Sequence, residues 1–116
     1  MYKGLAFIAY SVKDVPRALA FYRDVVGFTP GQSFGDHWAE FDVGDATFGI
    51  GNGESIGVPA GSQRAAAFEV ADIVAEQARL RSNGVEVSDI HEFPACRACS
   101  VTDPDGNRFW LHQRSG

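Results

Sequence analysis

Glu40, Glu69 and His112 have side chains that would bind a divalent cation if the fold brought the three together. Carboxylate and imidazole groups hold such an ion when at least three converge and further groups orient them. Two other interpretations stay open. The three groups are solvated, or Glu40 and Glu69 accept hydrogen bonds from a ligand amine or pair with Arg108. Each interpretation requires that strands carry these residues to one face of a sheet.

A second candidate for chemistry is the CRAC sequence at Cys96 and Cys99. Residues three apart on an extended strand face opposite sides of the sheet, so neither a disulfide nor one ion joins these two sulfurs. No second CxxC completes a tetrahedral zinc site. We expect Cys96 on the ligand-facing side with Ser100, and Cys99 beneath a helix. A nucleophilic Cys96 needs a base such as His91 or His112, whereas an inert thiol needs none.

Large aromatic side chains are the third candidate. Trp38 and Trp110 alternate onto the strand faces that we expect to turn inward, and Phe7 joins them. Such rings stack on a flat ligand, each well-placed pair adding about 0.5–1.5 kcal/mol beyond the area it buries. The alternative is that the rings fill the inside of the sheet as core.

The elements that position these residues are clearest near the C-terminus. A strand, a tight turn at Pro104 and Gly106, and a second strand follow one another. In the second strand Arg108, Trp110 and His112 alternate with apolar residues, so one face is polar and aromatic and the other apolar. We expect this strand to form a wall of a pocket.

The rest of the chain shows the same organisation twice. In the first half we predict a strand over 4–12, a helix over 14–26 capped by Asp14 and closed by Gly27, and strands over 29–34, 37–43 and 46–51. In the second half we predict a strand within 66–73, a helix from Asp72 to about Ser82, and strands over 85–90, 95–102 and 107–113. The sequence AAFEVADI at 66–73 repeats IAYSVKDV at 8–15 at an offset of 58, half of the 116 residues. Two copies that are each too small to bury their own apolar face predict paired modules in one domain.

Composition narrows the class of protein. The net charge is −5 over 116 residues, without a cluster of Lys or Arg, which argues against nucleic acid or an anionic membrane as partner. The sequence has no apolar run long enough to span a bilayer, and its start, MYKGLAFIAYSV, leads into a strand rather than a signal peptide. Two cysteines do not make a disulfide framework. We therefore expect a cytoplasmic protein.

Three stretches resemble the vicinal oxygen chelate superfamily, which includes glyoxalase I, extradiol dioxygenases, and fosfomycin and bleomycin resistance proteins. They are KDVPRALAFYRDVVGF in the first half, AFEVADI in the second and DPDGNRFWLHQ at the end. The resemblance covers essentially the whole chain. It implies an α+β fold in which two βαβββ modules form a cupped mixed β-sheet around a cavity, with helices on the convex side. It also implies a homodimer.

The resemblance further implies where a metal ion would be held. The expected ligand positions carry Phe7, Ala65 and Trp110, and none of these side chains binds a hard cation. We therefore expect no metal and no other cofactor. A displaced site formed by Glu40, Glu69 and His112 is the alternative.

Together these observations predict one domain over residues 1–116, with a module of about 1–51, a connector of 52–63 and a second module of about 64–116. We expect it to bind and sequester a small organic molecule, cationic or aromatic, without a metal ion. The alternatives are a metal-dependent lyase or dioxygenase, and a non-catalytic interaction module with a filled cup; the residues that would catalyse a reaction are not evident. The expected ligand-binding residues are Phe7, Ser11, Trp38, Glu40, Glu69, Cys96, Ser100, Arg108, Trp110 and His112.

Overall fold

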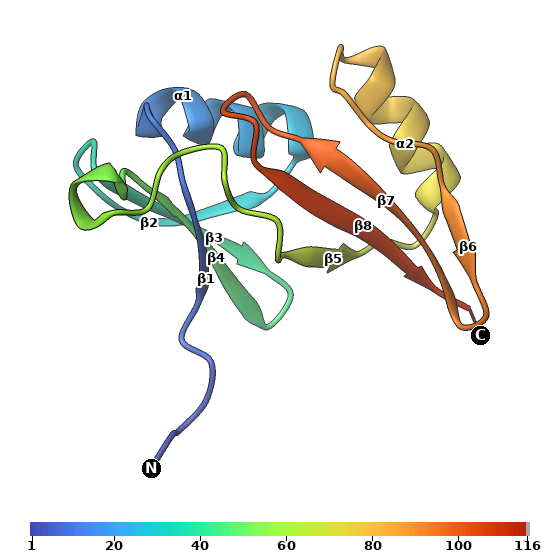
Figure 1. Ribbon diagram of the computed structural model, residues 1–116, viewed down its shortest axis with the longest axis horizontal. Coiled ribbons are helices and arrows are strands. Elements are labelled where there is room, and N and C mark those ends of the chain that lie inside the picture. The colour runs from blue at the N-terminus through green and yellow to red at the C-terminus, as the bar shows by residue number, and fades with distance from the viewer. Residues whose placement is uncertain (116) are drawn as a thin grey trace. The chain divides into compact units, whose positions relative to one another are not determined.

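The structure, a computed structural model, describes residues 1–115. The chain divides into two compact units, Met1–Ser62 and a second unit that begins at Gln63. The first unit contains β1 (Ile8–Ser11), α1 (Val15–Ala20), η1 (Phe21–Val26), β2 (Thr29–Phe34), β3 (Trp38–Val43), β4 (Ala46–Gly51) and η2 (Glu54–Ile56). The second contains β5 (Ala67–Glu69), α2 (Ile73–Ser82), β6 (His91–Phe93), β7 (Cys96–Thr102) and β8 (Arg108–Arg114) (Figure 1). The prediction that both modules form one domain stays a prediction.

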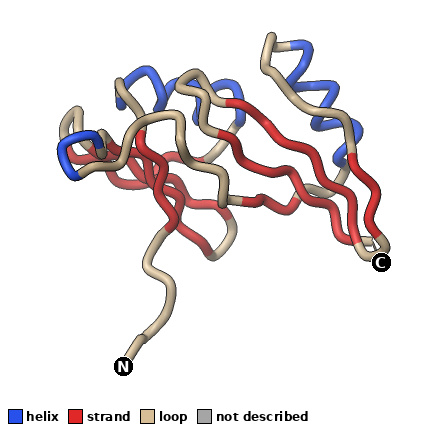
Figure 2. The backbone as a smooth tube through the Cα atoms, in the orientation of Figure 1, coloured by secondary structure: helices blue, strands red, loops and turns tan. Residues whose placement is uncertain are grey.

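The two units share one topology. The strand orders are β1-β4-β3-β2 in the first sheet and β5-β8-β7-β6 in the second. In each sheet the first strand pairs in parallel with the last, and the other pairs are antiparallel. A helical segment follows the first strand of each unit (Figure 2). The predicted α+β class with two βαβββ modules is therefore confirmed.

Aromatic packing against the helix forms the core of the first unit. Tyr22 on η1 is fully buried, and its ring centroid lies 5.3 Å from that of Phe48 and 5.9 Å from that of Phe41. Phe48 and Phe41 alternate with residues that face the other way, because successive side chains of a strand point to opposite faces. The helix thus covers one face of this sheet. The other face carries the side chains of Ala9 and Ser11 on β1 and of Trp38 and Glu40 on β3.

The two helix starts at Asp14 and Asp72, and the end of the first helical segment at Gly27, agree with the prediction from the sequence. The Asp14 carboxylate accepts a 3.0 Å hydrogen bond from Arg17 N, and the Asp72 carboxylate accepts one of 3.0 Å from Ala75 N. Each bond satisfies a backbone donor that the first turn of a helix leaves free. The first helical segment ends at Gly27, whose φ of 97° lies in the left-handed region that glycine adopts readily.

Two predicted strands differ from the structure. The first begins at Ile8 rather than at residue 4. Residues 85–90 form no strand; Val87 makes a single bridge to Val101, and β6 begins only at His91. The regular pairing with β7 stops there because the Ser88 hydroxyl, rather than its carbonyl, accepts a 2.8 Å hydrogen bond from Ser100 N, and side chains of α2 bind the carbonyl groups of this segment. Arg81 donates to Val87 O at 2.8 Å, and Gln77 donates to Ser88 O at 2.9 Å.

A buried hydrogen-bond network closes the turn between β7 and β8. The Asp103 carboxylate accepts hydrogen bonds from Asp105 N at 2.9 Å, Asn107 N at 2.9 Å and Asn107 Nδ2 at 3.0 Å. Asp103 is 4% exposed and Asn107 is fully buried. Because buried polar groups must be paired, this network fixes the direction in which β8 leaves the turn.

Candidate functional site

Trp38 lies flat on β4 on the face of the first sheet that the helix leaves uncovered. Its backbone pairs with Gly51, and its ring covers Gly49 and Gly51. A Cβ built on Gly49 would lie 2.5 Å from two carbons of the indole ring, and one on Gly51 would lie 2.7 Å from a third. Glycine within a strand marks a place where another group approaches closely, and here that group is the indole.

Two further contacts fix the orientation of the indole. Its Nε1 donates a 2.8 Å hydrogen bond to Glu40 Oε2. The ring of Phe7 meets it edge to face, with centroids 5.1 Å apart and an angle of 66° between the planes. Glu40 and Trp38 are two residues apart on β3, so they share a face of the strand. The result is a rigid aromatic surface with a carboxylate at its edge.

An open pocket of about 320 Å³ adjoins this ring. It is lined by Phe7, Ala9, Tyr10, Ser11, His37, Trp38, Gly51, Asn52, Gly53, Ile56 and Val58. Small-molecule sites typically have volumes of about 300–1,000 Å³ and mostly apolar walls, so this pocket matches a ligand of modest size.

The wall formed by residues 52–58 is held in place by Ser11. The Ser11 hydroxyl donates to Val58 O at 2.8 Å and accepts from Gly53 N at 3.0 Å. This hydroxyl therefore positions the loop, and its role in the pocket is to support the wall. The sequence predicted these residues only as a connector. The sequence feature that could have indicated a pocket wall is the presence of two apolar residues, Ile56 and Val58, within a stretch rich in Gly, Ser and Pro.

Of the predicted site residues in the first unit, Phe7, Ser11 and Trp38 line this pocket, and Glu40 is hydrogen-bonded to Trp38. The expected ligand-binding residues do not include His37 and Asn52, which also line the pocket, or Gly49 and Gly51, which lie under the indole.

The predicted site residues of the second unit lie on the uncovered face of its sheet. Glu69 on β5 is the pairing partner of His112 on β8, and Ser100 on β7 is the partner of Trp110. Glu69 Oε1 lies 2.5 Å from His112 Nδ1, and Glu69 Oε2 accepts a 2.7 Å hydrogen bond from Arg114 N. These contacts, that of the Arg114 amide first and that of His112 second, hold the pKa of Glu69 below its ordinary value.

The remaining predicted residues of this face are Cys96 and Arg108. Cys96 on β7 is partly exposed and pairs with Arg114, and Arg108 on β8 is exposed and pairs with Thr102. Cys99 lies on the opposite face and is fully buried. Burial raises the pKa of the Cys99 thiol, an effect that the positive charge of Arg81 only partly offsets. Cys99 is therefore an unreactive core residue.

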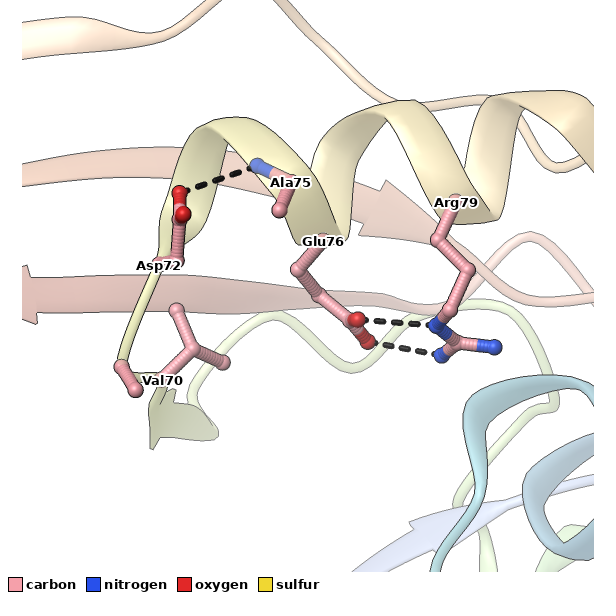
Figure 3. A pocket seen from close by; sticks show the side chains of 6 residues that line it. Val70, Asp72, Ala75, Glu76 and Arg79 are labelled. Atoms are coloured by element: carbon pink, nitrogen blue, oxygen red, sulfur yellow. Dashed lines mark hydrogen bonds and ion pairs between the residues drawn. The ribbon is translucent and has the colours of Figure 1, made fainter.

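Another pocket in the second unit, of about 450 Å³, lies at the first turns of α2 (Figure 3). Its charged side chains already have partners within the helix. The Asp72 carboxylate caps the helix through Ala75 N, and both oxygens of Glu76 bind Arg79, at 2.8 and 2.7 Å. A groove whose charged groups already form their own pairs is a weak candidate for a ligand site.

The side chains on these faces do not fit a divalent cation. Phe7 and Trp110 occupy two of the positions where the sequence resemblance implies ligands. Glu40 accepts a hydrogen bond from the indole, and both oxygens of Glu69 are in use. Within residues 1–115, no three His, Cys, Asp or Glu side chains are placed to hold a metal ion together. Three or more convergent ligands are needed for affinity, so no chemistry through a metal follows from this arrangement.

The comparison with known families decides the chain's membership. Residues 4–111 match the family model of the Glyoxalase/Bleomycin resistance protein/Dioxygenase superfamily. The chain belongs to this superfamily. Membership confirms the resemblance that the sequence motifs indicated. No curated protein sequence matches the chain.

Solved structures that are similar to this chain include an antibiotic binding protein. TnmS3, an antibiotic binding protein from Streptomyces sp. CB03234, is 28% identical to this chain over 98% of each chain, with a TM-score of 0.86. A glyoxalase/bleomycin resistance protein from the same strain is also 28% identical, over 95% of this chain and 100% of that one, with a TM-score of 0.82. Lactoylglutathione lyase from Agrobacterium tumefaciens has a TM-score of 0.80 over 97% of this chain and 95% of that one, and its 20% identity shows the fold alone. No helix within residues 1–115 is long and apolar enough to cross a lipid bilayer.

Proposed function

We propose that this member of the superfamily binds a small planar organic molecule in the pocket beside Trp38, without a metal ion, and acts by sequestering it. The observation that carries the proposal is the fixed indole, held by Gly49 and Gly51 beneath and by Glu40 at its edge, next to a pocket of about 320 Å³. A ring that is ordered before the ligand arrives loses little side-chain entropy on binding.

The similarity to TnmS3, an antibiotic binding protein, supports this class of function. The charge of this chain supports a cationic ligand. A net charge of −5 attracts cations over the whole surface, and the carboxylate of Glu40 lies at the edge of the ring. The face of an indole attracts a cation as well, by about 0.5–2 kcal/mol depending on how far the pair is removed from water.

Calorimetric titration with two flat probes of opposite charge tests the proposal. We expect proflavine, a planar cation, to bind, and anthracene-2-sulfonate, a planar anion of similar shape, to bind at least tenfold more weakly. Trp38→Ala is expected to weaken proflavine binding about tenfold, or about 1.4 kcal/mol. The matched control is Trp110→Ala, which removes the other tryptophan and is expected to leave proflavine affinity within about twofold.

Two results would contradict the proposal: no heat of binding at millimolar proflavine, or equal losses in the two tryptophan variants. Glu40→Gln separates charge from shape, because an amide oxygen still accepts the indole hydrogen bond while the negative charge is gone. We expect that variant to reduce the preference for proflavine over anthracene-2-sulfonate while its melting temperature stays near that of the parent.

The proposal includes self-association with a second copy of the chain. Tyr2 and Leu5 are almost wholly exposed, and Phe7 and Ile8 are about half as exposed. Apolar side chains gathered in one segment mark an association surface more often than isolated ones do. We expect sedimentation equilibrium to give twice the single-chain mass, and Leu5→Glu to shift it toward the monomer. A parent protein that is monomeric at all concentrations would contradict this part.

A further inference from the structure

A second cluster of functional side chains lies in the other unit, on the uncovered face of its sheet. Glu69 at the end of β5 pairs with His112 on β8, which runs alongside it (Figure 1). The carboxylate lies 2.5 Å from His112 Nδ1, and its second oxygen is held by Arg114 N. The imidazole is therefore oriented by a carboxylate that is itself fixed by the backbone.

The contacts of Glu69 determine which ring nitrogen of His112 accepts protons. The hydrogen bond from Arg114 N, followed by that of His112, lowers the pKa of Glu69, so the carboxylate is ionised at neutral pH. An ionised carboxylate only accepts hydrogen bonds, so Nδ1 of His112 carries the proton that they share. In a neutral imidazole the other nitrogen, Nε2, is then the acceptor. Among residues 1–115, the imidazole ring of His112 makes no hydrogen bond other than this one, so Nε2 is available to a ligand.

An aromatic surface adjoins this acceptor. Trp110 precedes His112 by two residues, faces the same side of β8 and is 38% exposed. The neighbours of Trp110 are Ala67 on β5 and Ser100 on β7, and the neighbour of His112 on β7 is Ala98, so the side chains beside Trp110 and His112 on these strands are small, apart from Glu69. Alternate residues of a strand are about 6.6 Å apart. A ring stacked on the indole with a hydroxyl at its edge spans that distance with one hydrogen bond of about 2.8 Å.

We propose that Trp110, His112 and Glu69 bind planar molecules that carry an acidic hydroxyl, such as phenols, enols and hydroxyquinones, and that Nε2 takes the proton of this hydroxyl. The O–H bond of the ligand breaks, an N–H bond forms at Nε2, and the electron pair stays on the ligand oxygen. The product is an imidazolium–oxyanion pair in which the charge of Glu69 stabilises the imidazolium. No oxidant or second reactant is needed. The site goes beyond the proposed function, because it selects another ligand chemistry with other residues.

Such a site has a characteristic dependence on pH. Binding needs one proton for Nε2 and the ligand oxygen to share. At low pH the imidazole is already protonated, and at high pH the ligand has already lost its proton, so affinity falls on both sides of a maximum. The titratable or charged groups that share this face of the sheet with His112 are Glu69 on β5, His91 on β6, Cys96 on β7, and Arg108 and Arg114 on β8.

The test uses 4-nitrophenol, whose hydroxyl ionises near neutral pH and whose phenolate absorbs visible light, and its methyl ether 4-nitroanisole, which has no proton to give. We expect 4-nitrophenol to bind at least tenfold more tightly than the ether, with a bell-shaped affinity over pH and an increase in phenolate absorbance on binding. His112→Phe is expected to abolish all three signatures. The matched control is His91→Phe, which removes a histidine of the same sheet and is expected to keep them.

Glu69→Gln provides a second variant that leaves the imidazole in place. Its amide donates a hydrogen bond to Nδ1, which makes Nε2 the protonated nitrogen, so we expect the phenolate absorbance to be lost. Three results would each overturn the proposal. They are equal affinity for 4-nitrophenol and 4-nitroanisole, a bell-shaped pH dependence of affinity that persists in His112→Phe, and no binding of 4-nitrophenol at millimolar concentration. None of these results bears on the binding of proflavine at Trp38, whose loss in Trp38→Ala is measured separately.

Discussion

Replacing Gly49 with alanine is expected to destabilise the fold by about 1–2 kcal/mol and to weaken proflavine binding about tenfold. The new methyl group would lie 2.5 Å from two carbons of the Trp38 ring, closer than any real carbon contact. The indole therefore has to lift from the sheet, and its hydrogen bond to Glu40 is lost. Urea denaturation and calorimetric titration measure the two effects.

A double-mutant cycle isolates the cause. In the Trp38→Ala background the methyl group meets no ring, and alanine is favoured over glycine in a strand, so Gly49→Ala is expected to stabilise that background by about 0.5 kcal/mol. Gly31→Ala on β2 is the matched control, since its nearest neighbour would lie at an ordinary 3.4 Å. If Gly49→Ala has the same effect with and without the indole, the ring does not rest on Gly49.

Replacing Asp103 with alanine is expected to cost about 3 kcal/mol of the free energy of unfolding. The change removes the acceptor of three hydrogen bonds, two of which come from the fully buried Asn107. A buried donor without a partner costs about 1–3 kcal/mol. The direction of β8 depends on this turn, so we expect 4-nitrophenol binding to be lost as well.

The control for that variant is Asp45→Ala, in the exposed turn between β3 and β4. An aspartate in a turn that buries nothing is expected to matter by no more than about 0.5 kcal/mol. Urea denaturation at neutral pH measures both variants. Equal midpoints would show that the Asp103 network contributes no more than a surface turn.

Local rules of chain geometry explain why the fold was predictable from the sequence. Asp14 and Asp72 are helix caps because their carboxylates reach backbone donors only three residues away, which is a local property. Segment 85–90 has the composition of a strand, but the side chains of Arg81 and Gln77, which take its carbonyl groups, come from a helix packed against it. Tertiary contacts of that kind leave no local pattern in the sequence.

The candidate site was predictable only in part, for the same reason. The strand alternation identifies Trp38 as a residue of the uncovered face, and its bond to Glu40, two residues away, follows from the same period. That Gly49 and Gly51 lie beneath the indole requires the register between β3 and β4. That Ser11 holds a loop more than forty residues away requires the folded chain, although the sequence alone suggested it as a ligand contact.

The proposed function requires that a ligand stacks on Trp38, and the two indole N–H signals of the protein report on this contact directly. The sequence holds only Trp38 and Trp110, so Trp38→Phe and Trp110→Phe assign both signals in a ¹H–¹⁵N spectrum. Adding proflavine is predicted to move the Trp38 signal progressively to saturation while the Trp110 signal stays in place. A Trp38 signal that does not move when proflavine binds, or that stays fixed at millimolar proflavine, would contradict the proposed function.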